Sequence, residues 1–301
     1  MSDEILIYEK DAAAHIARIT FNRPDKKNAL TTAMYPLLID ALDDAADDDD
    51  IKVVILRGAG GVFTTGQDMG EAYSWYEKPA AGERPRRPSQ RRRLAYDRKA
   101  QRAYHALYQH NKVIVAQVEK YALGGGLEFA LAADLTVVGH DALIGMPAAR
   151  FLGPVLGNLH LFFFRLGPAL AKDLLLTGRI AEARDAAERG VWNRFVPGEE
   201  VAAVTEELAA LVARMPADGL VIAKEAYRVV QNTPGLGAAE GFEILTHAFG
   251  TNLRFEDDEY NFVKIRSKVG VKKAFELRDR YFDGGEPIAC LLYTSPSPRD
   301  Q

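Results

Sequence analysis

Three consecutive glycines, Gly124–Gly126 in the stretch KYALGGGLEF, constrain the fold of this chain more than any other feature. They separate an apolar run from a helical pattern, and a glutamate, Glu128, follows two positions later. Glycine weakens strands and helices alike, so a run at their junction indicates that another group approaches the backbone closely. The first N–H groups of a helix lack partners within the helix, and they suit an oxygen that becomes negative during a reaction. The stretch therefore predicts an oxyanion-binding turn with Glu128 as its acid/base partner.

The sequence contains no recognisable nucleotide-binding or metal-binding motif. No Lys-Ser/Thr pair follows the three glycines, which excludes a P-loop, and the G-x-G-x-x-G spacing of dinucleotide-binding folds is missing. The histidines at 105, 110, 140 and 160 have no metal-ligand spacing beside a carboxylate. We expect neither a metal nor a separate cofactor.

Two continuous apolar runs, IKVVILRG and KVIVAQVEKYAL, are typical of strands buried on both faces of a parallel sheet. Each runs into glycine and then a helical pattern, which predicts an α/β fold. Upstream, ILIYEKDAAAHIARITF predicts two short strands around a turn. A helix through MYPLLIDALDDAA should follow, with Thr31 or Thr32 as its cap.

The character of the chain changes near residue 199. The stretches VAAVTEELAALVARM, GLVIAKEAYRVVQ, AAEGFEILTHAFG and VGVKKAFELRDRYF have amphipathic helical patterns with no strand between them. We therefore divide the chain into an α/β body, residues 1–198, and a helical region, residues 199–285. Residues 290–301, which contain the one cysteine, resemble translated adapter sequence and are predicted to be a non-native tail.

Composition gives no indication of a nucleic-acid or membrane partner. The net charge of -4 is too small to predict nucleic acid or a membrane surface, and no run of about 18 apolar residues is present. The N-terminus has no secretory signal pattern, and without cysteine in the predicted fold a cytoplasmic location is expected. The arginine-rich segment 82–93, GERPRRPSQRRR, is predicted to be a surface loop rather than an anion-binding or RNA-binding element.

A second glycine-bearing turn, GVFTTGQDMGEA, ends the first buried strand. Gly66 permits close backbone approach, and Asp68 is expected to cap a following helix. If the two strand ends lie side by side, each offers one N–H to a single carbonyl oxygen. Loss of one such donor costs about 2.7–4 kcal/mol of transition-state stabilisation.

Four segments, NRPDKKNAL, GVFTTGQDM, YALGGGLEFALAADLTV and LTGRIAEARDAAERGVWNRFVP, occur in an order and spacing that resemble the enoyl-CoA hydratase/isomerase family, the crotonases. The resemblance extends over residues 5–284. It implies a β-β-α spiral with a C-terminal helical trimerisation region, assembled as a homotrimer or hexamer. It also implies an acyl-CoA substrate, of which coenzyme A is a part.

The resemblance also assigns roles to particular residues. The backbone N–H groups of Gln67 and Gly125 would polarise the thioester carbonyl, which would then be the group that approaches the glycines. Contacts with coenzyme A would come from Lys26, Lys27, Ala29, Leu30, Asp68 and Met69.

Glu128 matches the first of the two glutamates that carry hydration in this family. The second is expected in a G-x-P-E segment, but this chain reads GMPA, so Ala148 stands in its place. Either Glu128 performs both proton transfers or another group substitutes. The candidates for a substitute are Glu71, Tyr73, Glu119 and His160.

Four functions remain open at this point, and enoyl-CoA hydratase is preferred. A hydrolase of an acyl-CoA or a β-diketone needs only one carboxylate to activate water. An isomerase also needs one acid/base group, but family isomerases usually keep the second glutamate position. A non-catalytic acyl-CoA-binding or RNA-binding relative is favoured by Ala148 and the arginine-rich segment, and disfavoured by Glu128.

Overall fold

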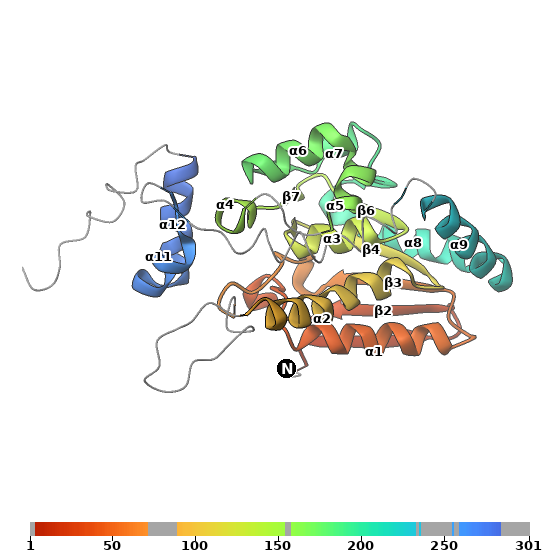
Figure 1. The fold of residues 1–301 in the computed structure, drawn as a ribbon. Coiled ribbons are helices and arrows are strands. Elements are labelled where there is room, and N and C mark those ends of the chain that lie inside the picture. The colour runs from red at the N-terminus through yellow and green to blue at the C-terminus, as the bar shows by residue number, and fades with distance from the viewer. Residues whose placement is uncertain are drawn as a thin grey trace, which may run out of the picture.

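The computed structural model of this chain describes residues 4–71, 89–153, 158–232, 235, 255 and 259–283 (Figure 1). Tyr73, the first part of the arginine-rich segment (82–88), the expected helix over 238–250 and the tail at 290–301 lie outside these residues. Within the described ranges, no helix combines the length and the apolar character needed to cross a membrane.

A six-stranded sheet forms the body, in the order β1-β2-β3-β4-β6-β9. The first two strands pair antiparallel, as the predicted turn between them requires, and the other neighbours pair parallel. Both continuous apolar runs are central strands, which confirms the α/β prediction. The strands are β1 (Leu6–Asp11), β2 (Ile16–Phe21), β3 (Val53–Gly58), β4 (Val113–Val118), β6 (Leu135–Gly139) and β9 (Arg194–Val196).

A second, three-stranded sheet lies beyond the end of β4, in the order β5-β7-β8. The chain turns from β4 into β5 (Tyr121–Leu123) at Lys120, whose φ of 56° is in the left-handed region. Strand β7 (Leu143–Gly145) pairs parallel with β5, and β8 (Ile180–Glu182) pairs antiparallel with β7. Helix α3 (Gly125–Ala132) begins two residues after β5, so the glycine run joins the small sheet to a buried helix.

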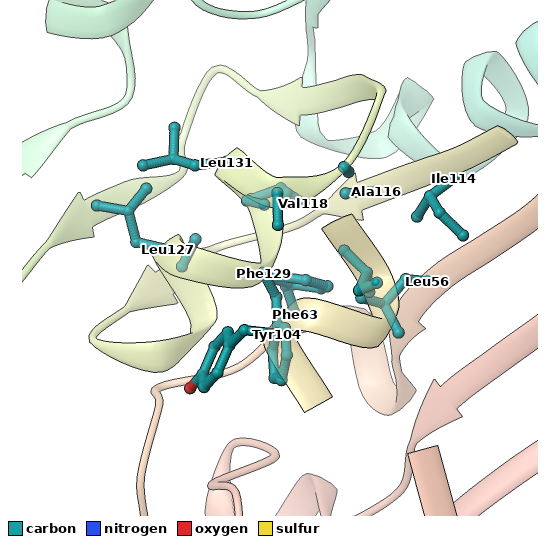
Figure 2. Packing of buried hydrophobic residues seen from close by; sticks show 14 of the residues in the cluster. Leu56, Phe63, Tyr104, Ile114, Ala116, Val118, Leu127, Phe129 and Leu131 are labelled. Carbon is teal, nitrogen blue, oxygen red and sulfur yellow. The ribbon is translucent and has the colours of Figure 1, made fainter. Parts of the chain in front are cut away.

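Helices cover both faces of the six-stranded sheet. Helices α1 (Met34–Asp47) and α2 (Gln90–Tyr108) pack with α3 on one face, around a core whose members include Leu56, Phe63 and Phe129 (Figures 1 and 2). Helix α8 (Val201–Ala213) packs on the other face. Because side chains alternate along a strand, successive residues of β3 serve the two cores in turn.

Two local predictions about helix starts are wrong. The residue before α1 is Ala33, with no side-chain cap; the Thr31 carbonyl accepts the Met34 N–H at 3.1 Å instead. The Thr32 hydroxyl is unsuited to capping because it faces the Glu71 carboxylate at 3.4 Å. The segment 82–93 is not a loop throughout, since α2 begins at Gln90 with the Ser89 hydroxyl as its cap, and residues 90–93 are helical.

The predicted C-terminal helices are confirmed where the structure describes them, as α8, α9 (Ala217–Asn232) and α12 (Val271–Phe282). Helix α11 (Phe262–Val269) was not predicted. Helix α8 packs on the sheet, whereas α11 and α12 form a separate apolar cluster next to α4 (Ala149–Leu152) (Figure 1). The division at residue 198 stays a prediction. The remaining elements are η1 (Pro24–Lys26), η2 (Ala59–Gly61), α5 (Leu159–Leu161), η3 (Phe162–Leu166), α6 (Gly167–Thr177), α7 (Arg184–Ala187) and η4 (Gly198–Glu200).

Candidate active site

The two glycine-bearing turns meet at the ends of β3 and β4. Thr64 forms a parallel bridge with Ala122, in which the Leu123 N–H donates to the Thr64 carbonyl at 3.2 Å. Beyond this bridge, a Cβ placed on Gly66 would lie 3.2 Å from the Gly125 nitrogen and would collide with the Leu123 carbonyl. Gly66 is therefore packed against the backbone of the Leu123–Gly125 segment, and the Leu123 carbonyl excludes any larger residue at position 66.

At each position of the triple run, a different feature of the structure requires glycine. Gly124 has φ 54° and ψ −126°, a backbone conformation that residues with a side chain rarely adopt. A Cβ on Gly125 would collide with the Tyr104 hydroxyl. A Cβ on Gly126 would lie 2.6 Å from Thr64 Cγ2 and 2.9 Å from the Thr64 carbonyl oxygen. Atoms of the protein itself thus account for the close approach at the second and third glycines, without a bound substrate.

The N–H groups of Gln67 and Gly125 are candidates for an oxyanion site. Leu30 accepts from the Asp68 N–H and donates to the Gly66 carbonyl, both at 2.8 Å. Because backbone groups alternate in direction along a paired strand, the Gln67 N–H points away from Leu30. Neither the Gln67 nor the Gly125 N–H has a hydrogen-bond acceptor among the residues that the structure describes. Their catalytic role stays a prediction.

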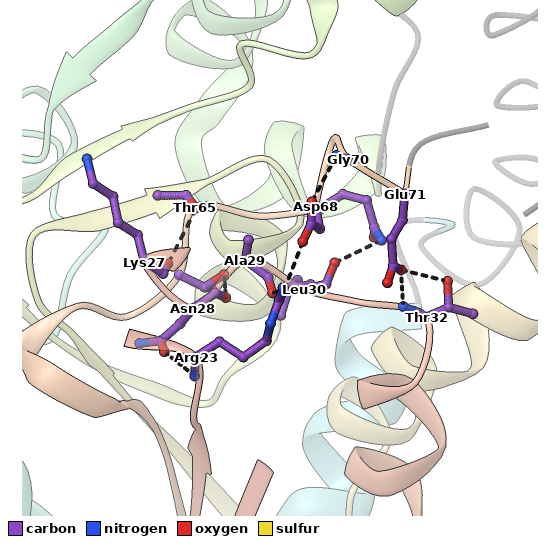
Figure 3. A network of polar contacts seen from close by, with 12 residues as sticks. Arg23, Lys27, Asn28, Ala29, Leu30, Thr32, Thr65, Asp68, Gly70 and Glu71 are labelled. Carbon is purple, nitrogen blue, oxygen red and sulfur yellow. Dashed lines mark hydrogen bonds and ion pairs between the residues drawn. The ribbon is translucent and has the colours of Figure 1, made fainter. Parts of the chain in front are cut away.

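The residues predicted to contact coenzyme A come from two segments that are joined side by side (Figure 3). Arg23 Nη1 donates to the Ala29 carbonyl at 2.7 Å and to Asp68 Oδ2 at 2.9 Å, and the Thr65 N–H donates to the Lys27 carbonyl at 3.2 Å. These bonds bring Lys27, Ala29, Leu30 and Asp68 together beside Gln67. Their binding role is not tested by these contacts.

The other two predicted contacts differ in their surroundings. Lys26 is exposed, as is Lys27, whose Nζ lies 4.8 Å above the Tyr121 ring. Met69 packs against the apolar cluster of α11 and α12, and its carbonyl accepts from Arg266 at 2.6 Å. The helix that Asp68 was expected to cap falls outside the described residues; Asp68 Oδ1 instead accepts the Gly70 N–H at 2.8 Å.

Asn28 supports this part of the site and was missed by the sequence analysis. Its side chain is completely buried, and its φ of 54° is in the left-handed region. Its Oδ1 accepts the Arg23 N–H at 2.8 Å, and its Nδ2 donates to the carbonyls of Ala59 and Val62 at 2.9 and 2.6 Å. Asn28 therefore fixes the turn that precedes Ala29 and Leu30.

Glu128 lies in the first turn of α3, as predicted, and only 5% of it is exposed. Its Oε1 accepts the Asn158 N–H at 2.6 Å and lies 3.3 Å from Asn158 Nδ2. Asn158 Oδ1 in turn accepts from Gln101 Nε2 at 2.6 Å. If the only role of Glu128 were a favourable interaction with the helix dipole, its side chain would remain in solvent, because burying a carboxylate without hydrogen bonds is costly. The burial and its partners indicate a specific role for Glu128.

Tyr35 and Tyr104, which the sequence analysis did not single out, lie between Glu128 and Gln67. The Tyr35 hydroxyl donates to Gln67 Oε1 at 2.6 Å, and the Tyr104 hydroxyl has Glu128 and the Tyr35 oxygen as alternative acceptors for its one proton. Burial raises the pKa of Tyr104 well above 10, and the neighbouring Tyr35 and Glu128 raise it further. Burial likewise raises the pKa of Tyr35. Both phenols therefore stay protonated at neutral pH.

Ala148 occupies apolar surroundings. It is partly buried and packs against the main core and against the cluster of α11 and α12, together with Met69 and Leu152. A small apolar side chain fits these neighbours well, whereas a carboxylate there would lose hydration.

The residues considered as substitutes for the missing carboxylate are dispersed. His160 is a packed histidine, 7% exposed, with its ring edge-on to Tyr108 at 6.0 Å. Glu119 lines a different cavity of about 560 Å³, together with His140 and Asp141. Glu71 Oε2 accepts the Thr32 N–H at 3.2 Å. None of these contacts indicates a second proton carrier.

The described part of the chain contains no group of three or more His, Cys, Asp or Glu side chains arranged to hold a metal ion.

The chain is similar to known proteins in both sequence and structure. The sequence profile described as "Enoyl-CoA hydratase/isomerase" matches residues 11–249. An enoyl-CoA hydratase of Mycobacterium tuberculosis is 31% identical over 245 residues, 81% of this chain and 87% of that protein. A 2,3-dehydroadipyl-CoA hydratase of Escherichia coli is 30% identical over 240 residues, 79% and 88%. The crystal structure of an enoyl-CoA hydratase from Mycobacterium smegmatis has a TM-score of 0.79 at 26% identity and covers 92% of this chain and 94% of its own.

The glycine run yields a stability prediction. Replacing Gly126 with alanine should lower the free energy of unfolding by about 1–3 kcal/mol, because the new methyl group overlaps Thr64 in a packed interior. Gly219→Ala in α9 is the matched control, since its Cβ would have only an ordinary 3.7 Å contact with Pro216; this change should be neutral or stabilising by up to about 1 kcal/mol. Urea unfolding of both variants measures the difference. Equal effects would show that the contact at Gly126 is not tight.

Proposed function

Because the chain belongs to the enoyl-CoA hydratase/isomerase family, we propose that it is an enoyl-CoA hydratase that works with one carboxylate, Glu128. The observation that supports this proposal is the packing of Gly66 against the Leu123–Gly125 backbone, at the start of the helix that bears Glu128. The substrate class follows from the family, whose named members include hydratases of acyl-CoA thioesters.

In this proposal the thioester carbonyl oxygen accepts hydrogen bonds from the N–H groups of Gln67 and Gly125. When water adds to the carbon β to the carbonyl, the electron pair of the double bond moves toward the thioester oxygen and forms an enolate. Donors held rigidly by the protein stabilise this charge without reorganising during the reaction. The packing of Gly66 against Leu123–Gly125 and the Leu30–Gln67 bridge supply such rigidity.

Glu128 performs the proton transfers. Its carboxylate takes a proton from water as the oxygen of that water bonds to the β-carbon, and the same proton then passes to the α-carbon as the enolate collapses. Water is thus divided into a hydroxyl and a hydrogen on adjacent carbons, and Glu128 ends ionised as it began. Asn158 holds one oxygen of this carboxylate, which supports a fixed orientation toward the substrate.

Hydrolysis of an acyl-CoA is the second candidate. The apolar contacts of Ala148 support chemistry with one carboxylate, and hydrolysis needs only one to activate water. The same N–H groups would stabilise the tetrahedral oxyanion, and coenzyme A would leave as its thiol.

The first test is the change Glu128→Gln assayed with crotonyl-CoA. The wild-type protein should remove the absorbance of the conjugated thioester without releasing free thiol, and the variant should lose at least about a hundredfold in kcat, because the amide cannot accept the proton. Free thiol released by the wild type would favour the hydrolase. Binding without either signal would contradict both enzymatic proposals. Glu119→Gln, in the separate cavity, is the control and should retain activity.

The second test is the change Ala148→Glu. If the missing carboxylate limits the rate, this variant should hydrate crotonyl-CoA about ten- to a hundredfold faster, in the range expected for a positioned acid/base group. Its apolar neighbours should favour the protonated form, which is the form needed to deliver a proton. Ala148→Gln, of nearly equal volume, controls for the change in packing. An unchanged or lower rate in a folded Ala148→Glu variant would contradict the view that the missing carboxylate limits hydration.

We also propose a cytoplasmic homotrimer or hexamer. Apolar side chains on α8 and α9 are exposed in the described chain, with Leu211 at 55% and Ile222, Val229 and Val230 at 67–69%. An exposed apolar patch of this kind suits a subunit contact. Sedimentation velocity should give three or six times the mass of one chain, whereas a monomer at micromolar concentration would contradict the proposal.

A further inference from the structure

A line of polar side chains connects the two halves of the proposed site. Tyr35 donates to Gln67, and the neighbouring Tyr104 hydroxyl has two possible acceptors for its one proton, the Tyr35 oxygen and the carboxylate of Glu128. Its members come from four elements: the turn after β3, then α1, α2 and α3. Tyr35 and Tyr104 are each 7% exposed and Glu128 5%. The line is therefore built into the interior, where such bonds are stronger and bulk water does not compete.

Tyr104 is held from both ends. Its ring stacks on Phe129, with centroids 4.5 Å apart and an interplanar angle of 22° (Figure 2). Its hydroxyl lies against Gly125, where a Cβ would collide with it. The absence of a side chain at Gly125 thus makes room for this hydroxyl, beside one expected oxyanion donor and in contact with the carboxylate.

Helix α2 also contacts Glu128 indirectly, through Gln101 and Asn158. Gln101 lies three residues before Tyr104, which places both side chains on the same face of the helix. Gln101 donates to Asn158 Oδ1 at 2.6 Å, and Asn158 donates to Glu128 at 2.6 Å through its backbone N–H. One face of α2 thus contacts Glu128 directly through Tyr104 and indirectly through Gln101.

We propose that Tyr104 is a positioning residue for Glu128: its hydroxyl donates its one proton to the carboxylate and stabilises the ionised form that accepts the proton from water. This inference rests on the proposed function. It gives the site a fixed partner for its one carboxylate, where a second carboxylate is missing at Ala148. The raised pKa of Tyr104 keeps the hydroxyl a donor throughout the neutral range.

The proposal concerns ionisation, so the other ionisable groups around α3 matter. Helix α1 contributes Tyr35, and α2 contributes Tyr104. Helix α5, which also contacts α3, carries His160, packed against Tyr108. Arg165, on η3, donates to the carbonyls of Leu131 and Ala133 at the far end of α3. The two tyrosines are thus the ionisable groups whose interaction with Glu128 the structure records directly.

The test is the change Tyr104→Phe, which removes the hydroxyl but keeps the ring against Phe129. With crotonyl-CoA, kcat should fall about ten- to a hundredfold, the range for one hydrogen bond to a charged group, while KM changes less than about twofold. The acid limb of the pH profile of kcat/KM should move upward by about one pH unit, because the ionised carboxylate has lost a donor. Tyr108→Phe, one turn further along α2, should leave kcat and the profile unchanged.

A readout independent of turnover separates this inference from the proposed function. Infrared titration of the carboxyl stretch, assigned with Glu128→Gln, should show the Glu128 midpoint about one pH unit higher in Tyr104→Phe than in the wild type. An unchanged midpoint in the folded variant would overturn the inference, even if activity falls. A shifted midpoint in a protein that hydrates no acyl-CoA would support the contact and reject the proposed function.

A second variant covers the case in which Tyr104→Phe does not fold. Incorporation of 3-fluorotyrosine at position 104 keeps the hydroxyl and makes it a stronger donor, so the Glu128 midpoint should move downward instead. Shifts of opposite sign for the two variants are expected only if the hydroxyl donates to the carboxylate. A midpoint that stays at the wild-type value with fluorotyrosine would refute that role.

Discussion

The close contact between the turn at Thr64–Gly66 and the glycine run at Gly124–Gly126 is the constraint on which the rest of this site depends. Parallel strands β3 and β4 are neighbours, so the segments that leave their ends emerge side by side. With side chains on both segments they would be forced apart. With Gly66 packed against Leu123–Gly125 and Gly126 packed against Thr64, the two backbone segments lie close together.

This contact also determines where a carboxylate can be placed. Helix α3 starts at Gly125, so Glu128 lies one turn from the expected oxyanion donors and on a helix whose residues are almost all buried. Burial alone would favour the neutral acid, whereas the Asn158 N–H and the Tyr104 hydroxyl favour the ionised form. Burial and hydrogen bonding thus act in opposite directions on the ionisation of Glu128. Such a balance suits a group that must both accept and return a proton.

Features set by short stretches of sequence were predicted well. The strands at 53–58 and 113–118 are continuous apolar runs, and the position of Glu128 in the first turn of α3 follows from the adjacent glycines. The cap of α1 was wrong because the Thr32 hydroxyl faces Glu71, a residue 39 positions away. Tyr35 and Tyr104 were missed for a similar reason. Tyr35 reads as one apolar position of the predicted first helix, no helix was predicted around Tyr104, and the two hydroxyls become neighbours only through the packing of α1 and α2.

The surroundings of the site are asymmetric, and this bears on how one carboxylate can suffice. Hydrogen-bond donors from α2 and from Asn158 lie on one side of the site, while Ala148 belongs to an apolar cluster with Met69 and the C-terminal helices. An enzyme with two carboxylates must accommodate repulsion between them when both are charged. With Ala148 at the position of the second glutamate, that position contributes no such repulsion to Glu128. The loss of the second glutamate and the presence of a buried tyrosine line are thus physically compatible parts of one arrangement.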